Sequence, residues 1–295
     1  MGARARGAAH PSRQVPWAFV LPAALVCCGL LLGPALVGAG YAFTRWDGLT
    51  PASWIGLGNF REFAREPVGK DVLRHTLTLA LVYVVGVNAV GLGLALGLQR
   101  VLRTRGLLRA LFFLPAVMSP LVVAYVWKFI LDADGPLNET LEALGLDGLA
   151  QPWLGQSDTA LLAIALVMIW QFSGYHMLIY LAGLQGVQRE LEEAAAVDGA
   201  SAWRRFRDIT FPLLRPALTI GVALSTITAL TVFDQVMALT GGGPAGATET
   251  LGTYVYAQAF TNGRYGYSAA VALVLVAVVS LVALVQLRLL RRRAA

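Results

Sequence analysis

The sequence predicts an all-α, polytopic membrane protein with six transmembrane helices. Of its 295 residues, 57% are hydrophobic and only 14% are charged, and the mean hydropathy is +0.65. This composition is too apolar for an ordinary soluble domain of that length. Six apolar runs are each long enough to cross a bilayer, which takes roughly 20 helical residues. They cover about 17–43, 76–98, 110–131, 159–184, 213–239 and 268–287.

The basic residues predict the orientation of these spans in the cytoplasmic membrane. The predicted inner segments carry 15 of the 23 Lys and Arg residues, whereas the three outer loops carry five, none and one. Because Lys and Arg concentrate in cytoplasmic loops, we expect both termini in the cytoplasm. Residues 1–16 and 291–295 are then cytoplasmic tails around one transmembrane domain over 17–290. The net charge of +6 therefore indicates membrane orientation and no nucleic-acid partner.

The first three spans carry few chemical signals. The only cysteines, Cys27 and Cys28, are adjacent in an apolar run, so they predict neither a disulfide framework nor a metal site. Residues 44–75 alternate acidic and basic side chains, which is typical of a solvated surface. In the third span, Pro115 and Pro120 free carbonyl groups that only neighbouring helices can satisfy within a membrane. Interrupted helices often line a solute path, but a simple packing kink is an equally good interpretation.

The fourth and fifth spans carry polar residues at helical spacing. Gln171 and Tyr175 are four residues apart and share a helix face. The fifth span has polar residues three or four positions apart, which predict one polar stripe along the helix, with Asp234 beside it. They are Ser225, Thr228, Thr231 and Gln235. A single Ser or Thr within a membrane most often bonds its own helix or a neighbour. A carboxylate is costly there unless it faces a cavity or a partner, or lies near the outer mouth.

The most informative stretch is the polar insert between the fourth and fifth spans, residues 189–216. Small apolar residues three and four apart predict a short amphipathic helix at its start. Gly199 offers the left-handed conformation that ends helices, and Ser201 can cap a second short helix. We expect Pro212 and Pro216 to end that second helix. Because so polar a segment cannot lie in hydrocarbon, it must lie on one side of the membrane.

This insert resembles the EAA loop of the membrane-spanning subunits of binding-protein-dependent ABC importers. The resemblance rests on Glu193-Ala194-Ala195, on Gly199 six residues after the glutamate, and on Ile209-Thr210-Phe211-Pro212. Phe211 stands where the family usually has leucine, which keeps the position apolar. The resemblance implies that the loop, about 186–213, holds a cytoplasmic coupling helix. The residues that would contact an ATPase are Glu193, Ala194, Ala195, Asp198 and Gly199.

Three further stretches narrow the resemblance to the carbohydrate-importer permeases, similar to the maltose and glycerol-phosphate systems. Gly56-Leu57-Gly58-Asn59-Phe60 precedes the second span, Leu181-Ala182-Gly183-Leu184-Gln185 ends the fourth, and Leu239-Thr240-Gly241-Gly242-Gly243-Pro244 follows the fifth. An aromatic belt at the membrane interface is then predicted from Tyr254, Tyr256, Phe260 and Tyr267.

The resemblance implies a permease subunit that translocates a sugar or oligosaccharide. It also implies a second permease chain that completes a heterodimer, two ATPase subunits and an extracytoplasmic solute-binding protein. ATP and Mg would bind to the ATPase, and this chain would hold no cofactor of its own. Short polar side chains beside an aromatic ring suit a neutral sugar, so we expect it to contact Gln171, Tyr175, Thr228, Thr231 and Asp234.

Three alternatives stay open. A glycerol-phosphate-type permease of the same family needs Arg or Lys near the cavity, where Lys128 is the one basic candidate. An ion-coupled secondary transporter needs an intramembrane relay and usually an inverted repeat, and Asp234 alone is a poor relay. A non-transporting scaffold or sensor subunit would leave the EAA-like spacing unexplained. The sequence has no phosphate-binding loop, HExxH motif or Ser-His-carboxylate arrangement, so nothing predicts an enzyme.

Overall fold

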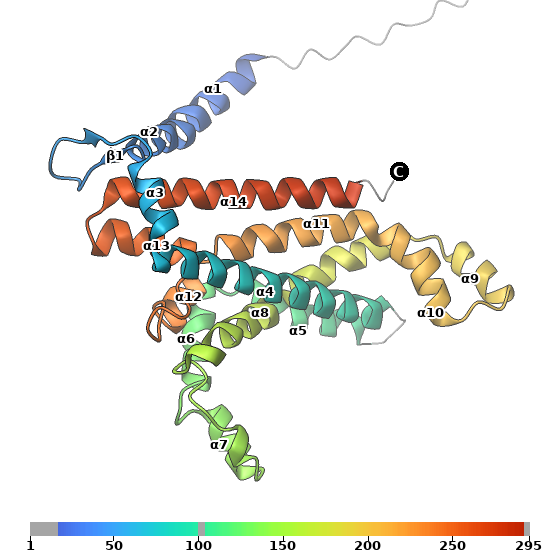
Figure 1. The fold of residues 1–295 in the computed structure, drawn as a ribbon. Coiled ribbons are helices and arrows are strands. Elements are labelled where there is room, and N and C mark those ends of the chain that lie inside the picture. The colour runs from blue at the N-terminus through green and yellow to red at the C-terminus, as the bar shows by residue number, and fades with distance from the viewer. Residues whose placement is uncertain (1–16, 100–103, 292–295) are drawn as a thin grey trace, which may run out of the picture.

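The computed structural model describes residues 17–99 and 104–291, and this part of the chain is almost entirely helical (Figure 1). The elements in chain order are α1 Trp17–Cys27, a π-helical stretch Cys28–Leu32, α2 Gly33–Tyr41, β1 Thr44–Arg45, β2 Ser53–Trp54, α3 Gly58–Arg65, α4 Pro67–Gln99, α5 Arg105–Val117, α6 Pro120–Ile130, α7 Pro136–Ala143, a 3-10 turn Asp147–Leu149, α8 Ser157–Gln185, α9 Arg189–Val197, α10 Ala202–Arg205, a π-helical stretch Phe206–Thr210, α11 Phe211–Leu230, α12 Asp234–Leu239, α13 Leu251–Tyr256, a π-helical stretch Ala257–Thr261 and α14 Tyr265–Arg291.

The two strands form one short antiparallel pair, in which Thr44 lies opposite Trp54. The predicted tails, 1–16 and 291–295, lie outside the described residues except for Arg291, where α14 ends.

The predicted membrane architecture is confirmed. Within the described residues, five helical segments are long and apolar enough to cross a membrane, and they are Leu21–Tyr41, Pro67–Gln99, Ser157–Gln185, Ala202–Leu230 and Tyr265–Gln286. The pair α5 and α6 makes a sixth if it counts as one broken span. Helices α4, α8, α11 and α14 run side by side along the molecule (Figure 1). Their shared core, with α6 and α12, includes Tyr83, Ile164, Met168 and Leu230.

The second and third spans differ from their predicted form. Helix α4 begins nine residues before the predicted start, and its 33 residues extend about 50 Å, more than the roughly 30 Å of bilayer hydrocarbon. Its first turns, where Arg74 pairs with Asp71 at 3.2 Å, therefore extend beyond the hydrocarbon. The predicted third span is two helices, α5 and α6, bent by 96°. Met118 and Ser119 have extended backbone at this break. Pro120 accounts for Ser119, because a proline disfavours the helical conformation in the residue before it.

The predicted limits of the fifth span were wrong at both ends. One helical segment runs from Ala202 to Leu230, so Pro212 and Pro216 do not end a helix. Pro212 lies in the first turn of α11, immediately after a π-helical stretch in which the Phe211 N–H bonds to the Phe206 carbonyl five residues back. Pro216 lies inside α11. A proline inside a membrane helix frees a carbonyl of the preceding turn but need not end the helix, because surrounding groups can satisfy that carbonyl. At the other end α11 stops at Leu230 and α12 is a separate helix, so the predicted polar stripe is not continuous.

Glycines allow the spans to approach closely. A Cβ added at Gly174 of α8 would lie 1.9 Å from the Phe112 carbonyl oxygen of α5. One added at Gly91 of α4 would lie 2.7 Å from the Cβ of His176 in α8. Small residues at such crossings let helix backbones touch, which is how helices pack without a hydrophobic driving force in lipid.

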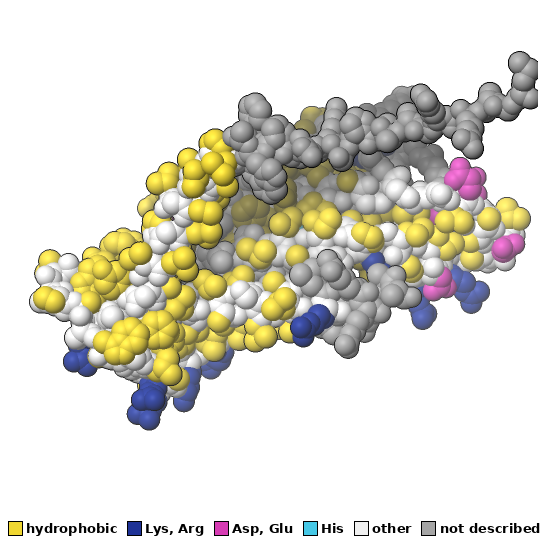
Figure 2. Space-filling model, turned by 90° about the horizontal axis from the view of Figure 1, so that it is seen from above, with side chains coloured by type: hydrophobic (Ala, Val, Ile, Leu, Met, Phe, Trp, Pro, Cys, Tyr) yellow, Lys and Arg dark blue, Asp and Glu magenta, His cyan; other side chains and the backbone are white. Residues whose placement is uncertain are grey.

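The molecule has two distinct ends. Figure 1 shows α9 and α10 projecting at one end and α3 with the strands at the other. Figure 2 shows apolar side chains along the length of one face, with most charged side chains along its edges and at the α9–α10 end. This distribution suits a body in hydrocarbon with polar regions outside it.

Candidate coupling hairpin and solute-facing residues

The helices α9 and α10 form a hairpin between α8 and α11. Helix α9 ends where the Ala200 N–H donates to the Ala195 carbonyl at 2.9 Å and the Gly199 N–H donates to the Ala196 carbonyl at 3.1 Å. This pair of bonds requires a left-handed residue, and Gly199 has φ of +80°. The Ser201 hydroxyl oxygen then accepts from the backbone N–H of Arg204 at 3.3 Å and caps α10. The predicted turn and cap are confirmed.

The hairpin exposes apolar side chains as well as charges. Val197 is 88% exposed and Trp203 is 68% exposed. The predicted contact residues are also accessible, since Ala195 is half-buried and the others are exposed, namely Glu193, Ala194, Asp198 and Gly199. Large exposed apolar side chains beside carboxylates are typical of protein-binding surfaces.

Glu192 anchors this hairpin, a role that spacing alone does not predict. The Thr210 hydroxyl donates to Oε1 of Glu192 at 2.6 Å, and Thr210 is 4% exposed. The bond ties α9 to the start of the fifth span across 18 residues of sequence. The two adjacent glutamates therefore differ in their contacts. Glu192 holds the hairpin to the span, whereas Glu193 is exposed. The Glu192 contact depends on how the hairpin closes, which no local pattern encodes.

Gln171 is buried at the break between α5 and α6. It is 0% exposed, and its Nε2 donates to the Met118 carbonyl at 3.2 Å. The Nε2 of Gln235, in α12, donates to Oε1 of Gln171 at 3.3 Å. A side chain of a neighbouring helix thus satisfies a carbonyl that the break between α5 and α6 leaves open. In this conformation Gln171 does not reach the surface.

The other predicted solute contacts are exposed. Tyr175 is 41% exposed, and Thr228, Thr231 and Asp234 are exposed as well. No hydrogen bond among the described residues joins any two of these four. The Thr231 hydroxyl donates to the Ile227 carbonyl of its own helix at 2.8 Å. Gln171 and Tyr175 differ in burial although four residues separate them, because α8 packs on several sides.

A buried polar network joins three spans, and the sequence did not predict it. The Nδ2 of Asn88 in α4 donates to the Ser225 hydroxyl of α11 at 2.9 Å, and the Tyr180 hydroxyl of α8 donates to Oδ1 of Asn88. Nearby, Nε2 of His176 lies 3.3 Å from the Gly221 carbonyl. All four polar side chains are at most 9% exposed. An asparagine inside the second apolar run was the available signal, since amides in lipid seek partners on other helices.

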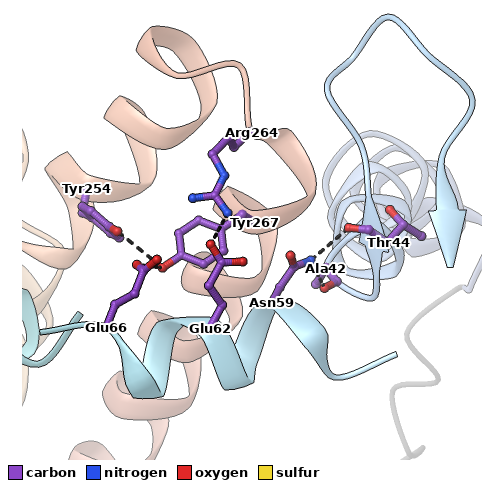
Figure 3. Close-up of polar contacts among 8 residues, drawn as sticks. All are labelled: Ala42, Thr44, Asn59, Glu62, Glu66, Tyr254, Arg264 and Tyr267. Carbon is purple, nitrogen blue, oxygen red and sulfur yellow. Dashed lines mark hydrogen bonds and ion pairs between the residues drawn. The ribbon is translucent and has the colours of Figure 1, made fainter. Parts of the chain in front are cut away.

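The opposite end of the molecule is held by a second polar cluster, drawn in Figure 3. Nδ2 of Asn59 in α3 donates to the carbonyls of Ala42 and Thr44, at 2.8 and 2.9 Å. Arg264 pairs with Glu62, and the Tyr267 hydroxyl donates to Glu66 at 3.0 Å. The alternating charges of residues 44–75 therefore also hold α3 to the start of α14.

Half of the predicted aromatic belt was wrong. Tyr254 and Tyr267 are 4% and 2% exposed, and their hydroxyls lie 3.4 Å apart (Figure 3). They pack inside the cluster, whereas Tyr256 and Phe260 remain exposed at 40% and 68%. The aromatic residues near the last span therefore divide between packing and the surface.

The glycine-rich loop after α12 is folded on itself. Gly241 and Gly242 have φ of +62° and +89°, which favour glycine, and the Thr248 hydroxyl donates to the Gly243 carbonyl at 2.6 Å. The loop partly buries Glu249, and this burial raises the pKa of its carboxyl above the ordinary value.

Comparisons with known proteins agree with this architecture. The family described as binding-protein-dependent transport system inner membrane component matches residues 89–295. The multiple sugar-binding transport system permease protein MsmF of Streptococcus mutans is 33% identical over 277 residues, covering 94% of this chain and 95% of the relative. The lactose transport system permease protein LacF of Rhizobium radiobacter is 34% identical over 281 residues, covering 94% of each chain.

A solved structure shows the same fold. It is that of a bacterial alginate ABC transporter in complex with an alginate pentasaccharide-bound periplasmic protein. A chain of that structure superposes with a TM-score of 0.81 at 24% identity, and 94% of each chain is covered.

Proposed function

Because this chain belongs to the family of binding-protein-dependent transport system inner membrane components, we propose that it is the permease subunit of an ATP-driven importer for a sugar or oligosaccharide. The exposed hairpin α9–α10, which turns at Gly199 between two spans, carries the coupling part of the proposal. The assignment of a sugar as the solute rests on the relatives, two of which are named for sugar and lactose transport.

The hairpin transmits force from an ATPase on the cytoplasmic side. Glu193, Ala194, Ala195, Asp198 and Gly199 contact the ATPase, with Val197 and Trp203 as apolar anchors. The anchor between Glu192 and Thr210 passes the movement to α11. Closure of the ATPase dimer then draws the cytoplasmic ends of the spans together and opens the solute cavity outward. By linkage, a loaded binding protein favours that closure by the same free energy with which closure favours its binding.

The proposed assembly contains a second permease chain, two ATPase subunits and an extracytoplasmic solute-binding protein. ATP and Mg bind the ATPase. Both termini and the hairpin face the cytoplasm, which follows from the distribution of Lys and Arg. The end with α3 and the strands then faces outward.

The solute contacts are Tyr175, Thr228, Thr231 and Asp234, which this chain leaves exposed. Hydroxyls and a carboxylate beside an aromatic ring suit the hydroxyl groups and apolar face of a neutral sugar. Gln171, which is fully buried, contributes by holding the α5–α6 break beside them. Lys128 is exposed near the end of α6 and is the basic candidate within a described span that would favour a phosphorylated solute instead.

The test is uptake by proteoliposomes that contain the chain with its partner permease and ATPase subunits. Labelled sugar should enter only with ATP inside and loaded binding protein outside. The Gly199→Val variant should insert normally but lose uptake, because a β-branched residue is poorly tolerated at a φ of +80°. Gly199→Asn is the matched control and should keep most uptake, since Asn adopts the left-handed conformation.

Three outcomes would contradict the proposal. Uptake without the ATPase would indicate an ion-coupled transporter. Normal uptake by Gly199→Val would refute docking at this turn. Competition by phosphate esters but not by free sugars would replace the sugar with a phosphorylated solute. Orientation is checked separately by Val197→Cys in a background without Cys27 and Cys28, which an impermeant maleimide should label only in inverted vesicles.

A further inference from the structure

A polar pocket lies between three helix ends close to the coupling hairpin, and the proposed transport cycle does not use it. Its volume is about 230 Å³. It is lined by Gln99, Arg105, Arg109, Leu181, Leu184, Gln185 and Val187. Gln99 ends α4, Arg105 begins α5 and Gln185 ends α8, so the pocket lies where three helices reach the same membrane surface. The hairpin begins four residues after Gln185.

The charged residues that line this pocket, among those the structure describes, are two arginines. Arg105 and Arg109 are four residues apart on α5 and share one face. Neither forms an ion pair with any described residue, and no carboxylate from the described part of the chain lines the pocket. The first turn of α5 adds the positive end of a 13-residue helix. The two glutamines contribute amide groups that can donate further hydrogen bonds.

Arg109, which lines the pocket, also carries a buried donor without a partner. Nε of Arg109 is buried and has no hydrogen-bond partner among the described residues. A guanidinium N–H withdrawn from water without an acceptor is unfavourable, and this applies more strongly to charged donors. The pocket therefore provides donors and positive charge for an acceptor that the described residues do not supply.

We propose that this pocket binds the phosphate group of an anionic membrane lipid. The planar forks of two arginines match phosphate oxygens, and basic pockets between spans on the cytoplasmic side suit anionic headgroups. The buried side chains of Leu181, Leu184 and Val187 form an apolar wall for the adjoining glycerol and acyl carbons.

The position of the arginines along α5 favours a lipid over an acidic protein surface. Three leucines on the other face of α5 are strongly exposed. Leu107 is 71% exposed, and Leu111 and Leu114 are each 59% exposed. Such a row belongs in hydrocarbon, so the arginines at the start of α5 lie at the level of lipid phosphates. A bound lipid joins α4, α5 and α8 beside the hairpin, where the cytoplasmic ends of these spans must move together.

The proposal is tested by native mass spectrometry of the intact transporter during titration with phosphatidylglycerol. The wild type should retain one such lipid per copy of this chain. The double variant R105Q/R109Q should bind it roughly 30-fold more weakly, given the usual contribution of each arginine near an anionic lipid surface. R61Q/R65Q on α3 is the matched control, because it removes two arginines four residues apart at the opposite end, and it should bind like the wild type. R105K/R109K keeps the charge without the forks and should lie between.

The same spectra identify the ligand source. Phosphatidylcholine has the phosphodiester without net negative charge and should not be retained, and inorganic phosphate at equal concentration should not displace phosphatidylglycerol. Displacement by phosphate would assign the site to a free anion and overturn the lipid. Loss of ATPase subunits from R105Q/R109Q with lipid still bound would assign the arginines to a protein contact. Equal retention by R105Q/R109Q and R61Q/R65Q would refute the site. Lipid retention is read without transport, so this result is independent of the proposed function.

Discussion

Removing the hydroxyl of Tyr180 should weaken the packing of α4 against α8 and α11. Tyr180 is 0% exposed, and its hydroxyl is the only described donor to Oδ1 of Asn88. Tyr180→Phe keeps the ring, and therefore the apolar contacts, but leaves that amide oxygen buried without a partner. Asn88 keeps its Nδ2 bonds to the Val84 carbonyl and to Ser225.

Two effects set the size of this change. An acceptor left unsatisfied in a protein interior costs about 1–3 kcal/mol. In membranes, side-chain hydrogen bonds average about 0.6 kcal/mol and reach about 1.7, because the unfolded chain in lipid also finds partners. Since Asn88 and Tyr180 are far from water in the folded chain, we expect a loss near the upper membrane value, about 1–1.5 kcal/mol.

The measurement is a double-mutant cycle on the transporter, with unfolding by SDS in mixed micelles as the readout. The cycle comprises Tyr180→Phe, Asn88→Leu and both together. If the bond acts as described, the double variant should lose less than the sum of the singles, with a coupling of at least about 0.5 kcal/mol. Tyr175→Phe is the control on the same helix, because Tyr175 is 41% exposed, and it should change stability by less than about 0.5 kcal/mol.

Additive losses in the cycle would refute this account, because Tyr180 and Asn88 would then contribute independently of their hydrogen bond. An equal loss from Tyr175→Phe would also refute it, since the effect would then follow from any lost tyrosine hydroxyl on α8.

Three further predictions concern other parts of the chain. Gly174→Ala should reduce the amount of folded protein in membranes by severalfold, because its Cβ would meet the Phe112 carbonyl at 1.9 Å, whereas Gly93→Ala, with nothing within 4 Å, should not. Carboxyl NMR should show Asp47 titrating near pH 2, because hydrogen bonds within its own turn lower its pKa to about 2, and any stability from this group should be lost as pH falls below about 4. Burial raises the pKa of the Glu249 carboxyl, so its contribution to thermal stability should be lost as pH rises through and above the ordinary carboxyl range, and Glu249→Gln should remove that dependence.

Equal yields of the two alanine variants would show that α5 and α8 are not in backbone contact. Titration of Asp47 near pH 4 would show that its turn is open in solution. An unchanged pH dependence in Glu249→Gln would place the responsible group elsewhere.

Local and periodic features of this fold were predictable from the sequence. Gly199 and Ser201 were assigned correctly because a left-handed turn and an N-cap depend on a few consecutive residues. The long apolar runs that became α4, α8 and α14 were found because bilayer thickness sets their minimum length. Their exact starts were not, since α4 continues through charged residues once it has left the hydrocarbon.

Features that depend on tertiary contacts were not predictable. Pro212 and Pro216 predicted a stop, but one helical segment continues through both, which membrane helices allow when surrounding groups satisfy the freed carbonyls. Gln171 was predicted to contact the solute because it is polar. In the structure it is buried, and its side chain donates to the Met118 carbonyl, which belongs to another part of the chain. The bond between Glu192 and Thr210 and the network around Asn88 join residues whose proximity no periodicity indicates.

The bend between α5 and α6 bears on how the chain is synthesised. At 13 and 11 residues, these helices extend only about 20 Å and 17 Å, so neither can cross the bilayer alone. The Met118 carbonyl at the bend accepts a hydrogen bond from the Gln171 amide of α8, and α8 leaves the ribosome later. A nascent chain that ends before residue 157 therefore lacks the segment that shields this carbonyl. We expect the α5–α6 pair and α8 to enter the lipid together. A chain truncated between α6 and α8 should be recognised as incomplete and degraded.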